Sequence, residues 1–163
     1  MESSKIYATK KEYDDHLYSI EPSLRGKPIP KTFTAGIEQG VFFAVSPEIC
    51  EEVFPEGKEK DSYIKLIQHE LAHRLHVRLV KGKEERMGPV WFYEGFAVYA
   101  ADQYAAAAPK LTEKEIWEVV TDSKRGSYLK YRTVMEFFLK THSLQEMVDH
   151  AGDKDFVEWL RKE

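Results

Sequence analysis

The chain has 163 residues, a hydrophobic content of 42% and a formal net charge of -4 at pH 7. This length allows one domain with a substantial core, so we expect a single domain over residues 1–163. The mild negative charge gives no reason to expect nucleic acid or an anionic membrane as a partner, and the apolar content argues against disorder.

The sequence contains no recognisable targeting or membrane-spanning signal. Its first residues, Met-Glu-Ser-Ser-Lys, lack the basic-then-apolar pattern of a signal peptide, and no apolar run approaches about 18 residues. The only cysteine, Cys50, cannot form an intramolecular disulfide, and its acidic neighbourhood without a histidine indicates an inert buried thiol. We therefore expect a soluble, cytoplasmic protein.

The first third of the chain predicts short strands and one helix. Residues 5–8 read as a strand. Residues 10–20 place apolar side chains on one helical face, with Thr9 as the candidate N-cap and His16 on the solvated polar side. Residues 21–31 contain three prolines and a glycine, which predicts a loop.

A hairpin is predicted next. Residues 32–35 and 40–45 are rich in β-branched and aromatic side chains, and they flank a glycine-bearing turn over 36–40. Ser-Pro then begins a short helical turn that runs to about residue 53. The charged residues 54–60 predict a loop.

The next helix carries the chemistry. Residues 62–81 read as one helix ending at Gly82, and they contain His69-Glu70-x-x-His73. On a helix, the two histidines are roughly 40° and about 6 Å apart, so their imidazoles can bind one face of a single metal ion. Glu70 lies beside that direction. Its carboxylate can reach a water activated by the metal, which suits a general base and not a ligand.

The pentapeptide also occurs by chance in unrelated helices, where the histidines are merely partly buried polar groups. The surrounding residues favour the metal interpretation, because apolar positions recur at three- and four-residue steps and predict a helix that packs into a core. These positions are Ile64, Leu66, Ile67, Leu71, Leu75 and Leu79.

A catalytic zinc site needs a third protein ligand and an open fourth position. His76 lies one further turn along, where an unbroken helix cannot fold it back onto the same ion, so we expect it beside the site or at the surface. Glu94 is the better candidate. It lies in an apolar helix beginning near Pro89, where a carboxylate is costly unless a cation meets it. Gly95 indicates a close neighbour, and a histidine helix facing Glu94 accounts for both features.

The rest of the chain predicts helices joined by turns. Two capping boxes, T-x-x-E at 112–115 and S-x-x-E at 143–146, mark helix starts. His142 and His150 are far from the motifs, and we expect them to be exposed. The predicted helices cover 113–121, 127–141, 144–152 and 154–161. Strands and a helix followed by helices only predict an α+β fold, with the metal at the junction.

The two motifs together resemble a known family. His-Glu-Leu-Ala-His at 69–73 and Trp-x-x-Glu-Gly-x-Ala-x-Tyr at 91–99, with twenty residues between the second histidine and the glutamate, are similar to the gluzincin metallopeptidases. The closest resemblance is to the small peptidase MA-like domains. It implies a small zincin-like fold, a peptide or protein substrate, and Zn²⁺ held by His69, His73 and Glu94.

The resemblance also assigns further roles. It implies that Glu70 is the catalytic base, that the hairpin supplies an edge strand for an extended peptide, and that Tyr128 stabilises the oxyanion, with Tyr131 in reserve. Tyr99 belongs to the motif, where we expect it to pack against or orient the ligand glutamate. Val98 stands where thermolysin's own variant has an aspartate, so the thermolysin subfamily proper is not indicated.

We therefore predict a zinc-dependent metallopeptidase. The alternative keeps the metal and drops hydrolysis, as a catalytically inactive protease-like domain that serves as a zinc-stabilised binding or regulatory module. Glu70 argues against the alternative because a site that only holds metal does not need that carboxylate. The small size of the chain argues for it. The sequence indicates no particular oligomeric state.

Overall fold

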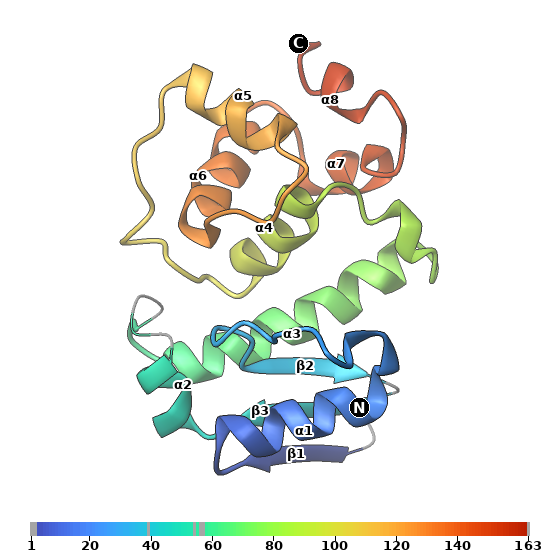
Figure 1. The fold of residues 1–163 in the computed structure, drawn as a ribbon. Coiled ribbons are helices and arrows are strands. Elements are labelled where there is room, and N and C mark those ends of the chain that lie inside the picture. The colour runs from blue at the N-terminus through green and yellow to red at the C-terminus, as the bar shows by residue number, and fades with distance from the viewer. Residues whose placement is uncertain (1–2, 39, 54, 56–57, 163) are drawn as a thin grey trace. The chain divides into compact units, whose positions relative to one another are not determined.

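The computed structural model describes residues 3–38, 40–53, 55 and 58–162. The helices and strands in chain order are β1 (Ser3–Tyr7), α1 (Lys10–Ile20), β2 (Ala35–Glu38), β3 (Val41–Val45), α2 (Pro47–Val53), α3 (Ser62–Leu79), α4 (Val90–Ala100), α5 (Glu113–Thr121), α6 (Tyr128–Phe138), α7 (Leu144–His150) and α8 (Phe156–Trp159) (Figure 1). The predicted α+β class is confirmed, because strands and helices come first and helices alone follow.

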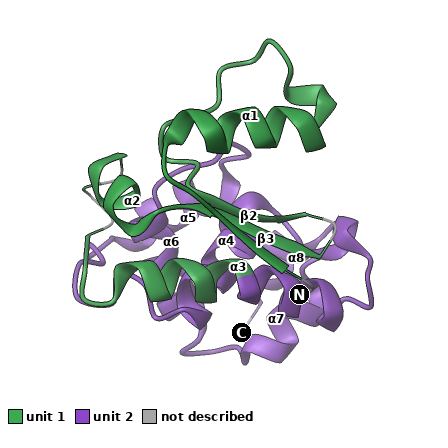
Figure 2. Ribbon diagram, turned by 90° about the horizontal axis from the view of Figure 1, so that it is seen from below, with its two compact units in different colours: residues 1–70 green, residues 71–163 purple. Residues whose placement is uncertain are grey.

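The chain divides into two compact units, residues 1–70 and 71–163, which Figure 2 draws in green and purple. The boundary falls inside α3, which is a continuous helix of 18 residues. The expectation of one domain over 1–163 stays a prediction. In the part of the chain that the structure describes, no helix combines the length and the apolar character needed to cross a lipid bilayer.

The first unit is built on a three-stranded sheet with the order β1-β3-β2. The central strand β3 pairs with β1 in parallel and with β2 in antiparallel fashion. Helix α1 covers one face of this sheet, where Tyr13 and Leu17 pack against Phe43 and Val45. The hairpin predicted from the sequence is therefore confirmed, and β2 is an edge strand.

The position of the hairpin turn differs from the prediction. Ala35–Glu38 forms β2, so the turn assigned to 36–40 begins too early. Gly36 faces Phe43 across the ladder, and a Cβ at Gly36 would lie 2.9 Å from the Phe43 Cζ atom. This glycine makes room for a phenyl ring and does not form the turn. Residue 39 lies outside the described residues, as do 54, 56 and 57 of the predicted charged loop.

Helix α1 begins as predicted, with one correction on its surface. The Thr9 side chain accepts from the Glu12 backbone N–H, and the Glu12 carboxylate accepts from the Thr9 N–H, which completes a capping box. His16 is not solvated as expected. Its ring stacks on Tyr7 at 5.4 Å and meets Phe43 edge-on at 5.1 Å. Burial, aided by the charge of Lys5, lowers the pKa of His16.

Helix α3 buries a different face from the one its leucines predict. Ile64, Leu71, Leu75 and Leu79 are exposed, so their expected place in a core is wrong. The buried stripe consists of His69, Ala72 and His76, which recur at three- and four-residue steps roughly 100° around the helix from the leucines. At the C-terminal end the left-handed residues are Lys81 and Gly82, with φ of 57° and 78°.

In the second unit, α4 packs along α6. A Cβ at Gly95 would lie 2.8 Å from Met135 Cγ, so the predicted close approach at this glycine is confirmed. The neighbour, however, is α6 and not the histidine helix. Arg132 of α6 donates to the carboxylate of Asp102, which lies just beyond the end of α4, and to the carboxylate of Glu136. Its guanidinium also lies 5.0 Å from the ring centroid of Tyr99. The contacts with Asp102 and Tyr99 hold α4 against α6, whereas Glu136 is a partner within α6 itself.

The two C-terminal capping boxes are confirmed at 112–115 and 143–146. The helices are shorter than predicted, since α6 ends at Phe138 and α8 covers only Phe156–Trp159. The expectation that His142 and His150 are exposed is wrong. Both are half-buried, because their rings lie 4.5 and 4.4 Å from the ring of Trp159.

His76 is fully buried, which excludes the surface position, one of the two alternatives predicted for it. Its ring stacks on Phe96 at 4.4 Å and meets Phe92 edge-on at 5.6 Å. Among the residues that the structure describes, neither ring nitrogen has a hydrogen-bond partner. Burial, with the neighbouring His73, lowers the pKa of His76 from 6.5 to about 4. The imidazole is therefore neutral at pH 7. At this pH it destabilises the folded state, because it is a buried polar group without a hydrogen-bond partner in the described part of the chain.

This environment predicts that His76→Leu stabilises the metal-free protein. At pH 7 the gain should be about 1 kcal/mol, because an unsatisfied buried polar group is removed. Below pH 6.5 the unfolded chain protonates His76 while the folded chain does not, so wild-type stability falls as the pH drops towards 4. The advantage of the variant should therefore grow in acid. Urea unfolding of both proteins with a metal chelator measures it, and parallel pH dependences would contradict a lowered pKa for His76.

Candidate metal site

Helices α3 and α4 carry the candidate ligands. His69 and His73 stand one turn apart on α3, and Glu94 lies in the middle of α4. His69 is 4% exposed and Glu94 is 2% exposed, whereas His73 is half-buried. Trp91, Phe92 and Phe96 make α4 so apolar that the helix is almost wholly enclosed. The one carboxylate in this helix is thus held away from water.

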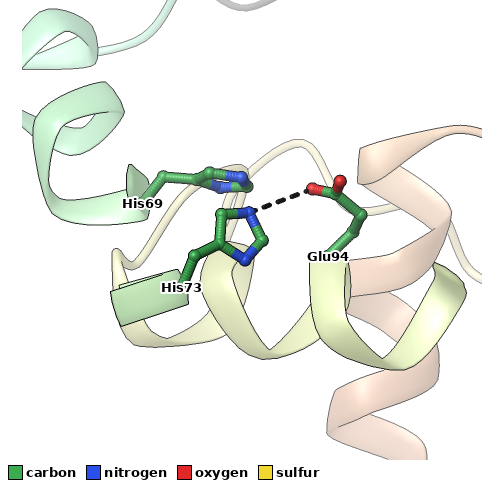
Figure 3. Close-up of side chains that lie close together, drawn as sticks. All are labelled: His69, His73 and Glu94. Carbon is green, nitrogen blue, oxygen red and sulfur yellow. Dashed lines mark ion pairs between the residues drawn. The ribbon is translucent and has the colours of Figure 1, made fainter. Parts of the chain in front are cut away.

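The three side chains form a group that could hold a metal ion. Each offers one ligand atom, and these atoms all lie within 4.8 Å of one another. The Nε2 atom of His73 is 3.5 Å from Oε2 of Glu94 (Figure 3). Donors bound at about 2.0–2.2 Å to a tetrahedral ion are roughly 3.4 Å apart, so this pair already has the required separation. The structure brings together all three residues that the sequence predicted as ligands.

Sequence reasoning missed Arg125. It lies just before α6, and its Nη1 atom is 2.7 Å from Oε1 of Glu94. The same nitrogen donates to the hydroxyl of Tyr128 at 2.7 Å, and Nη2 donates to the hydroxyl of Tyr93 at 3.4 Å. The sequence did carry one signal, since a buried glutamate requires a cation. It gave no means of choosing this arginine, which is 31 positions away and belongs to no motif.

The two candidate tyrosines of α6 have different surroundings. The Tyr128 hydroxyl accepts from Arg125 and interacts with the Glu94 carboxylate, so it lies beside the candidate ligands. Burial raises the pKa of Tyr128, and the Glu94 charge raises it further, so the hydroxyl keeps its proton at neutral pH. Tyr131 is buried, and its hydroxyl accepts from the Gly126 N–H. Tyr131 therefore fixes the turn that carries Arg125.

Glu70 and Tyr99 complete the predicted set. Glu70 is half-buried on α3, directly after His69. Burial is the main cause of the raised pKa of Tyr13, and the negative charge of Glu70 adds to it. Tyr99 lies on α4, five residues after Glu94, and its ring packs against the guanidinium of Arg132. The predicted inert character of Cys50 agrees with its surroundings, because burial raises the pKa of its thiol.

We compared the chain with known proteins. No family model matches it, and neither a curated protein nor a solved structure shows significant similarity. The arrangement of side chains is therefore what supports a functional assignment.

The geometry predicts one metal ion per chain that depends on Glu94. Glu94→Gln keeps the shape of the side chain but removes its charge. It should weaken metal binding more than a hundredfold, since loss of a group that merely supports a ligand already costs about 10–100-fold. Metal content measured by plasma mass spectrometry after dialysis tests this. Glu136→Gln, which alters an ion-paired carboxylate outside the group, should retain the metal. Full retention by Glu94→Gln would place the third ligand elsewhere.

Proposed function

We propose that this protein is a zinc-dependent metallopeptidase of the gluzincin type. The observation that carries the proposal is the convergence of His69, His73 and Glu94, with ligand atoms within 4.8 Å, next to a further carboxylate on the histidine helix. Two imidazoles and one carboxylate form a donor set that catalytic zinc sites use, with a fourth position open. A site that only holds metal would not require Glu70 at the residue after the first ligand.

Each residue then has a chemical task. A zinc ion held by this group would act as a Lewis acid and lower the pKa of a bound water towards about 7. Glu70 takes a proton from the attacking water and returns it to the leaving amine of the peptide, as a general base and then a general acid. The resemblance to gluzincins suggests these roles for Glu70, which directly follows the first candidate ligand on α3.

Tyr128 is the proposed donor to the developing oxyanion. Its raised pKa keeps the hydroxyl protonated, and a neutral hydroxyl beside the metal group can donate a hydrogen bond when negative charge forms on the carbonyl oxygen. Tyr131 is less suited to this task because its hydroxyl is held at the Gly126 N–H in the turn before α6, whereas the Tyr128 hydroxyl lies beside the Glu94 carboxylate.

Replacement of the base tests the proposal directly. Glu70→Gln should bind zinc as tightly as the wild type while peptide cleavage falls by about 10²–10⁴-fold, because only proton transfer is lost. Mass spectrometry of a random peptide library incubated with each zinc-loaded protein measures cleavage. Glu136→Gln serves as the matched control and should cleave normally. If the wild type binds zinc and cuts no peptide in a broad library, the binding-module alternative holds instead.

The two tyrosines provide a matched pair of variants. Tyr128→Phe should lower kcat by about 10²–10³-fold with little change in KM, since a donor to the oxyanion acts mainly in the transition state. Tyr131→Phe should lower kcat far less than Tyr128→Phe does and cost about 1 kcal/mol of stability through the lost bond from Gly126. Kinetics on one cleaved peptide, with thermal unfolding of both variants, distinguish these roles. The reverse pattern would transfer the oxyanion role to Tyr131.

A further inference from the structure

Arg125 joins three side chains of the candidate site through one guanidinium. Nη1 lies 2.7 Å from both Oε1 of Glu94 and the Tyr128 hydroxyl, and Nη2 lies 3.4 Å from the Tyr93 hydroxyl. Tyr93 and Glu94 belong to α4, and Tyr128 is the first residue of α6. Arg125 therefore links the helix that holds the third ligand to the residue proposed to donate to the oxyanion.

The two oxygens of Glu94 have separate partners. Oε1 faces Arg125, whereas Oε2 faces His73 Nε2 at 3.5 Å. A carboxylate held at one oxygen by a charged donor has its plane and its second oxygen fixed. Arg125 thus leaves Oε2 directed towards the imidazoles, which is the orientation that a ligand oxygen needs.

The ion pair between Arg125 and Glu94 is neither a fully solvated surface contact nor a contact that blocks the metal site. Exposed ion pairs contribute little, and the Arg125 side chain is 41% exposed, but its partner Glu94 is only 3% exposed. A buried carboxylate needs compensation, which a solvated one does not. A guanidinium that blocked the metal site would have to occupy the Glu94 oxygen that the metal would bind. Arg125 and the imidazoles face different oxygens, so the two can be satisfied together.

We propose that Arg125 is a positioning residue, which holds Glu94 with one oxygen towards the metal and aligns the Tyr128 hydroxyl beside it. This inference rests on the metal site of the proposed function, but not on peptide cleavage. Supporting residues that orient metal ligands typically contribute about 10–100-fold to metal affinity.

The test is the affinity of the full chain for Zn²⁺, measured by competition with a chromophoric chelator. Arg125→Met should weaken binding by about 10–100-fold. Arg125→Lys should weaken Zn²⁺ binding less, because lysine keeps the positive charge. Some loss remains, since lysine lacks the planar fork that contacts several groups at once. Arg86→Met is the matched control, since Arg86 is 44% exposed, forms an ion pair with Asp153 and should not affect the metal. The visible spectrum of bound Co²⁺ reports ligand geometry, and it should change in Arg125→Met only.

Three results would overturn the positioning role. Unchanged Zn²⁺ affinity in Arg125→Met would make the ion pair a structural contact only, and tighter binding would make Arg125 a competitor of the metal. If Arg125→Met does not fold by circular dichroism, Arg125→Lys decides, and an affinity and Co²⁺ spectrum equal to the wild type would count against the proposal. A wild type that binds Zn²⁺ but cuts no peptide refutes the peptidase function and leaves this test intact.

Discussion

A carboxylate buried in an apolar helix must be met by positive charge or by hydrogen-bond donors, because the cost of leaving it alone exceeds what the surrounding contacts can offset. Glu94 imposes this constraint on the chain. The apolar character of α4 encloses it, Arg125 contacts one of its oxygens, His73 of α3 faces the other, and the Tyr128 hydroxyl lies beside the carboxylate. The bare Cα of Gly95, the next residue, lets α6 come close enough to bring Tyr128 and Arg125 to Glu94.

Where the chemistry is local, the sequence was a good guide. The predicted cap at Thr9 and the predicted capping boxes at 112–115 and 143–146 all formed, because the residues that satisfy one another are only three apart. The spacing of His69 and His73 is fixed by helix geometry. Glu94 could be predicted as the third ligand, because a charged residue in so apolar a segment must have a compensating partner. These are the cases in which a few neighbouring residues determine the structure.

Where the outcome depends on distant partners, the sequence was misleading. Periodicity shows that α3 has an apolar stripe, but it does not show which face the rest of the chain covers, and the covered face carries His69, Ala72 and His76. His16 gained aromatic neighbours from β1 and β3 that its own helix could not reveal. Arg125 is the extreme case. Its pairing with Glu94 depends on how α6 lies against α4, which no local pattern encodes.

The bridge from Arg125 to Glu94 has a thermodynamic consequence. If the segment before α6 orients Glu94, then metal binding at the candidate site is coupled to the arrangement of residues 122–127. Such coupling is reciprocal. Any molecule that favours the bridged arrangement of this segment must raise metal affinity by the same factor by which bound metal raises the affinity for that molecule. Under the proposed function, a substrate that contacts Arg125 or its neighbours would therefore raise the affinity of the candidate site for its metal ion.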